Sequence, residues 1–62
     1  MNPIWIYVAD SVPSDNAYVY IRLAGNEYNP IYCQYRLSPQ AFDPVVGDVR
    51  FPLNEVLKWS AG

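Results

Sequence analysis

The chain has 62 residues, of which 52% are apolar, and its formal net charge at pH 7 is −2. This composition is too apolar for a disordered chain, and the length predicts a single domain, residues 1–62. The single cysteine and the lack of histidine exclude an internal disulfide and a Cys/His zinc site. Apolar packing, or a partner chain, must therefore supply the stability.

The N-terminus lacks the basic and long apolar regions of a signal peptide. No stretch approaches the roughly 20 apolar residues of a membrane-spanning helix. We therefore expect a cytoplasmic protein that does not bind membranes. A single thiol agrees with a reducing compartment.

Three segments alternate with a period of two between aliphatic and aromatic or basic side chains, which is typical of β-strands. They are residues 4–12, 17–24 and 31–37. Turn-forming residues separate them, among them Pro13, Asp15, Gly25 and Pro30. The short connections favour an antiparallel meander of the three strands.

The middle of the remaining chain is predicted to be irregular. Residues 38–42 fit either one helical turn, with Ser38 as its cap and Pro39 at the first position, or a loop. Residues 45–51 indicate two very short strands around a turn at Gly47 and Asp48.

A C-terminal helix is predicted for residues 52–60, because Leu53, Val56, Leu57 and Ser60 recur at helical spacing. So short a helix does not persist alone, and we expect it to dock on the aliphatic face of the sheet. The predicted fold class is α+β, with an antiparallel sheet of three to four strands and a short C-terminal helix packed on one face.

The other face of this sheet is the first candidate binding site. Aromatic side chains with arginine are typical of protein–protein hot spots and of base-stacking platforms. Alternatively, these residues are the solvated side of an ordinary strand, or residues 38–51 cover them as a second core. The predicted face consists of Trp5, Tyr7, Tyr18, Tyr20, Arg22, Tyr32, Gln34 and Arg36.

Acidic residues in the predicted loops are the second candidate. If the loops gather at one end of the sheet, their acidic residues form a negative rim that steers association with a basic partner. These residues are Asp10, Asp15, Glu27, Asp43 and Asp48. The alternative is ordinary turn chemistry, in which each aspartate bonds its own backbone.

Catalysis and cofactors find no support in the sequence. Cys33 alternates onto the aliphatic face, where a lone cysteine is usually a small buried apolar residue. A thiolate nucleophile needs a base such as histidine, which the chain lacks, and it has no Gly-rich phosphate loop. We therefore expect a protein that is not an enzyme, with no catalytic residue, cofactor or metal.

At the level of class, the whole chain resembles the small proteins with which phages disable host machinery, anti-CRISPR proteins among them. The shared traits are small size, acidity, no catalytic residues and an aromatic-rich surface. The resemblance implies an inhibitor that blocks a larger bacterial protein or nucleoprotein complex by steric and electrostatic occlusion, as a monomer or a weak homodimer.

Two other functions agree with the same residues. The first is single-stranded nucleic-acid binding, with bases on the tyrosines and phosphates on Arg22 and Arg36. The negative net charge argues against direct nucleic-acid binding, which normally uses a basic surface. The second is a self-associating structural phage protein.

Overall fold

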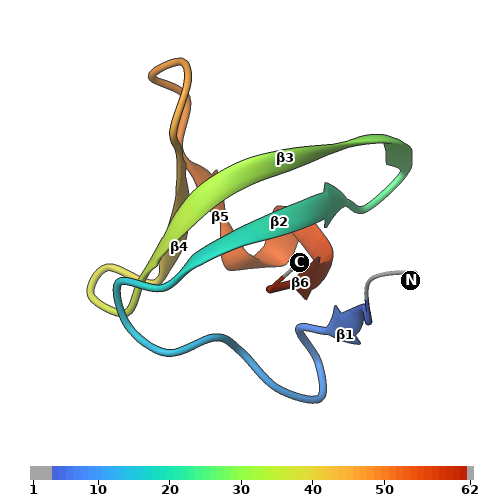
Figure 1. Ribbon diagram of the computed structural model, residues 1–62, viewed down its shortest axis with the longest axis horizontal. Coiled ribbons are helices and arrows are strands. Elements are labelled where there is room, and N and C mark those ends of the chain that lie inside the picture. Colours follow the sequence, from blue (N-terminus) through green and yellow to red (C-terminus); the bar gives the residue numbers. More distant parts are fainter. Residues whose placement is uncertain (1–3, 62) are drawn as a thin grey trace.

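Six strands form one antiparallel sheet in the computed structural model, which describes residues 4–61 apart from the side chains of residues 26–28. The order across the sheet is β1-β6-β2-β3-β4-β5, and β2, β3 and β4 follow one another as a meander (Figure 1). The strands are β1 (Ile6–Tyr7), β2 (Tyr18–Leu23), β3 (Asn26–Arg36), β4 (Ala41–Pro44), β5 (Phe51–Pro52) and β6 (Val56–Ser60).

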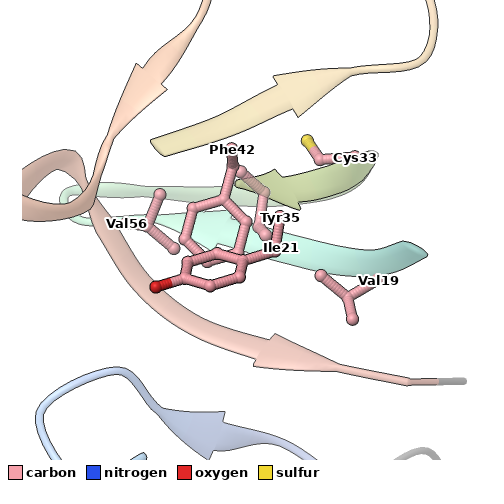
Figure 2. Packing of buried hydrophobic residues seen from close by; sticks show 6 residues of the cluster. All are labelled: Val19, Ile21, Cys33, Tyr35, Phe42 and Val56. Carbon is pink, nitrogen blue, oxygen red and sulfur yellow. The ribbon is translucent and has the colours of Figure 1, made fainter. Parts of the chain in front are cut away.

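The core lies on one side of the sheet, where the inward side chains of four strands meet (Figure 2). Tyr35 and Phe42 pack with ring centroids 5.0 Å apart, and neither side chain is exposed to solvent. Phe42 on β4 and Val56 on β6 belong to one cluster although β2 and β3 lie between their strands, so the sheet must curl around the core. The hydroxyl of Tyr35 accepts a hydrogen bond from Gln40 Nε2 at 2.9 Å.

Loop residues close the open side of this core. Val8, Val12 and Ala17, in the connection from β1 to β2, pack against the buried cluster together with Leu53. Trp59 is half-buried there, and its indole N–H donates a 2.9 Å hydrogen bond to the Ser11 carbonyl. These contacts cover the core face of the sheet, which was predicted to be covered by a C-terminal helix.

The predicted α+β class and C-terminal helix are wrong, because residues 4–61 contain no α-helix and nearly half of the chain is strand. A single 3₁₀ turn, η1 (Leu53–Glu55), precedes β6. The backbone of β6 pairs with β1 on one side and β2 on the other. A central strand forms backbone hydrogen bonds with neighbouring strands on both sides, whereas a helix of two turns is only marginally stable.

The predicted meander of the first three strands is also corrected. β6 lies between β1 and β2, so the first and second strands are not neighbours. β1 is limited to Ile6–Tyr7, because the chain turns at residues 8–10. Residues 38–42 contain no helical turn: 38–40 form a turn and β4 begins at Ala41.

The segments predicted for β2 and β3 agree with the structure, although β3 begins earlier, at Asn26. Leu23 pairs with Asn26, so Ala24 and Gly25 form a two-residue turn. Gly25 has φ = 79°, a conformation that glycine adopts without steric cost. Among residues 4–61 no helix is long and apolar enough to cross a membrane.

Candidate functional site

Three tyrosines form a contiguous row on the outer face, the side of the sheet opposite the core. Tyr18 and Tyr20 alternate with buried Val19 and Ile21 along β2, and Tyr20 lies directly opposite Tyr32 of β3. The ring centroid of Tyr32 lies 4.8 Å from that of Tyr20 and 5.9 Å from that of Tyr18. Tyr18, Tyr20 and Tyr32 are 53%, 39% and 44% exposed, so this tyrosine row presents part of each ring to solvent.

Two cations adjoin one end of the tyrosine row. Arg22 follows Tyr20 on β2 and pairs with Lys58 of β6, which in turn pairs with Tyr7 of β1. The Arg22 guanidinium carbon lies 5.0 Å from the ring centroid of Trp5, and Lys58 Nζ lies 6.0 Å from it. Lys58 Nζ also lies 5.6 Å from the Tyr7 ring. These distances are typical of cation–π contacts, which hold the cations against the outer face.

A second group of charges lies toward the other end of the row. Asp43 of β4 pairs with Gln34 of β3, and its carboxylate accepts a 2.6 Å hydrogen bond from Arg50 Nε. Arg36 Nη1 lies 3.9 Å from the same carboxylate. Both arginine side chains are about half exposed, so these ion pairs contribute little to stability. Two positive charges thus share one negative charge at this end.

The basic residues of the protein are concentrated on the outer face, together with the acidic Asp43 that two of them contact. All four basic residues of the chain lie on the outer face or are bound to it: Arg22, Arg36, Arg50 and Lys58. Asp10 and Asp15 lie in the connection between β1 and β2, and Asp48 lies in the connection between β4 and β5. The outer face is thus basic and rich in tyrosine, although the net charge of the whole chain is −2.

Three exposed valines, the valine strip, follow β4 in the chain, and the first of them lies beside the tyrosine row. The amide of Val45 donates a 3.0 Å hydrogen bond to the carbonyl of Tyr32, which extends the β3–β4 pairing by one residue. Val45, Val46 and Val49 are exposed in the β4–β5 connection, which extends away from the sheet in Figure 1. Exposed valines beside tyrosines are a feature of protein docking surfaces.

The acidic residues predicted to form a rim are dispersed: Asp43 belongs to β4 on the outer face, the side chain of Glu27 lies outside the described residues, and the other three lie in two separate connections. The β1–β2 connection, which carries Asp10 and Asp15, and the β4–β5 connection, which carries Asp48, leave the sheet in different directions (Figure 1). The carboxylate of Asp15 accepts a 2.9 Å hydrogen bond from the Leu37 amide, so it fixes one loop against another. The structure does not gather these three aspartates into one surface.

Every aromatic and basic residue predicted for the face is on it, and the structure adds members that sequence reasoning missed. Lys58 was assigned to a helix and Arg50 to a hairpin, so neither was counted with the tyrosines. The missed signal is the alternation of Leu57, Lys58 and Trp59, which fits a strand as well as a helix. The helical spacing of the residues around it favours a helix and so conceals this alternation.

Cys33 is buried on the core side, as the alternation predicted. Burial, and secondarily the negative charge of Asp43, raises the pKa of the thiol from 9.0 to about 12. We expect the folded protein to resist alkylation at pH 8 and to react only on unfolding, which mass spectrometry after iodoacetamide treatment would measure. Alkylation of the folded protein as fast as of the denatured chain would contradict this burial.

The same pKa predicts a dependence of stability on pH. The unfolded thiol ionises from about pH 9, whereas the folded thiol stays protonated up to about pH 12. Between these values the unfolded state gains relative stability, so the free energy of unfolding should fall by about 1.4 kcal/mol per pH unit from this group. The difference between the pH profiles of wild type and Cys33→Ala isolates this contribution.

Among the described residues, no three histidine, cysteine or acidic side chains come together as a possible metal site. The outer face, a surface of adjoining aromatic rings and cations, is the candidate site. Comparisons of the chain with protein-family models, with curated proteins and with solved structures gave no match.

Proposed function

We propose that the protein is a non-catalytic binding module that attaches to a larger macromolecule through its outer face. The observation that carries this proposal is the exposed tyrosine row with all four cations of the chain around it. Tyrosine and arginine contribute a large share of the binding energy at macromolecular interfaces, because they combine wide apolar contact with polar groups. Half-exposed rings on a sheet face lose little conformational entropy when they bind.

An inhibitor that blocks a larger protein is a second candidate, and the valine strip favours it. Val45, beside Tyr32, and the exposed Val46 and Val49 of the same connection would give a protein partner apolar contacts. The cations around the row would then meet an acidic surface of that partner. Attachment there would cover the partner's own binding surface, as the class resemblance implies.

The proposal predicts that capture of a partner depends on the tyrosine rings. Wild type, Tyr20→Ala/Tyr32→Ala and Tyr20→Phe/Tyr32→Phe would be immobilised in parallel and exposed to a bacterial lysate. We expect the phenylalanine variant to retain the same protein or nucleic acid as wild type, and the alanine variant to lose it. The identity of the retained molecule would be read by mass spectrometry and sequencing. Equal retention by all three variants would contradict a role for this face.

A further inference from the structure

The outer face has the geometry and charge that a flexible polyanion with flat bases requires. We infer that the ligand of this face is single-stranded nucleic acid, with bases stacked on the tyrosine row and phosphates beside the flanking cations. This inference rests on the proposed function, since it names the ligand of the same surface. It also reverses the expectation drawn from net charge, because the fold brings four basic residues and one acidic residue, Asp43, to this face.

The rings supply the first part of the argument. Neighbouring centroids in the row are 4.8 and 5.9 Å apart, and each ring is roughly half exposed. Unpaired bases stack on such rings with little regard to sequence, because every base has a π-face. In a duplex the bases are already stacked and paired, so this surface should favour single strands.

The cations supply the second part. Arg22 lies beyond Tyr20 toward the β2–β3 turn, whereas Arg36 lies beyond Gln34 toward the opposite end of the hairpin. Lys58 extends the first group across β6, and Arg50 extends the second at Asp43. Positive charge is thus placed at both ends of the row, where a strand lying along the hairpin would bring its phosphates.

Other occupants fit these observations less well. A second copy docked face to face would bring two sets of four cations together, which like-charge repulsion opposes. An acidic protein surface would complement the cations and contact the valine strip. The test must therefore distinguish such a protein partner from nucleic acid. The exposed rings favour nucleic acid, because planar bases stack on aromatic side chains.

The first test measures affinity for a fluorescent single-stranded oligonucleotide of about ten nucleotides, a length within the site sizes of small β-domains. The matched probes are the same strand without bases and the duplex of the same sequence. We expect the single strand to bind at least about tenfold more tightly than either. Its affinity should fall about 7- to 50-fold between roughly 50 and 200 mM salt if two to four cations neutralise phosphates.

A pair of charge variants supplies the second test. Asp43→Asn and Asp10→Asn change the net charge by the same amount, but Asp43 contacts Arg36 and Arg50 on the outer face, whereas Asp10 lies in the connection from β1 to β2. We expect Asp43→Asn to raise oligonucleotide affinity about three- to tenfold, and Asp10→Asn to change it less than twofold. Equal effects would show that overall charge, and not this face, controls binding.

The two proposals fail in distinguishable ways. No binding of the oligonucleotide at low salt, or equal affinity for the strand without bases, would overturn nucleic acid as the ligand. If tyrosine-dependent capture of a single protein from nuclease-treated lysate accompanied that result, the proposed function would stand with a protein as its partner. Loss of tyrosine dependence in both experiments would overturn both proposals.

Discussion

Replacement of Phe42 with alanine is expected to unfold most of the protein at room temperature or to lower its melting temperature by about 12–40 °C. Phe42 has no exposed surface, and it packs against Tyr35 at the centre of the core. Truncation of a buried phenylalanine costs about 3–5 kcal/mol, whereas a chain of this length is stable by only roughly 3–9 kcal/mol. Thermal denaturation followed by circular dichroism measures the effect.

Two controls show that the position, and not the loss of a ring, sets this cost. Phe42→Leu keeps most of the buried volume and should cost about 1.5 kcal/mol or less. Tyr32→Ala removes a ring of similar size from the outer face, where it is 44% exposed, and should be much milder than Phe42→Ala. A Phe42→Ala variant as stable as Tyr32→Ala would contradict the core described above.

The double variant Tyr20→Ala/Tyr32→Ala is expected to lose at least about 30-fold in affinity for a single-stranded oligonucleotide while it remains folded. Each base stacked on an aromatic ring contributes about 1–3 kcal/mol, and the variant removes two of the three rings in the row. Both side chains point away from the core, so the cost to folding is limited largely to their mutual ring contact. Fluorescence anisotropy measures the affinity.

The matched control for this variant is Tyr20→Phe/Tyr32→Phe, which keeps both rings and removes only their hydroxyls. Stacking should survive, and the affinity should stay within about threefold of wild type. If the phenylalanine variant binds as poorly as the alanine variant, hydroxyl hydrogen bonds and not ring stacking hold the ligand. Unchanged affinity in the alanine variant would exclude the tyrosine row as the binding surface.

Local alternation was sufficient to predict the central hairpin. In β2 and β3 the buried residues Val19, Ile21 and Cys33 occupy every second position, and a glycine at the turn allows the strands to reverse. No other structure explains a strict period of two with β-branched residues. The tyrosines opposite these residues were therefore assigned to one face correctly.

The C-terminal strand could not be predicted from local pattern alone. Leu53, Val56, Leu57 and Ser60 satisfy helical spacing, and residues 56–60 also satisfy the spacing of a strand. The choice depends on partners distant in sequence, because β6 pairs with Ile6 and Tyr7 of β1 and with β2. Trp59 adds a contact to Ser11, 48 positions away. Pairing between strands so distant in sequence cannot be predicted from the pattern of one segment.

This error in the fold concealed part of the candidate site. A helix over residues 52–60 separates Lys58 from Arg22, so the predicted face contains only two basic residues, Arg22 and Arg36. The register of β6 places Lys58 beside Arg22, and the Asp43 carboxylate brings Arg50 to the same face. Net charge is a sum over the whole chain, so it carries no information on how a fold distributes that charge.

The most direct test of a nucleic-acid-binding outer face is the NMR spectrum of the aromatic ring protons during titration with a single-stranded oligonucleotide. Bases that stack on the row would shift the ring protons of Tyr18, Tyr20 and Tyr32 through their ring currents. The rings of Tyr35 and Phe42, which are buried in the core, serve as internal controls and should keep their positions. Shifts of Tyr18, Tyr20 and Tyr32 without shifts of Tyr35 and Phe42 would support the account, whereas an unshifted tyrosine row at saturating oligonucleotide would contradict it.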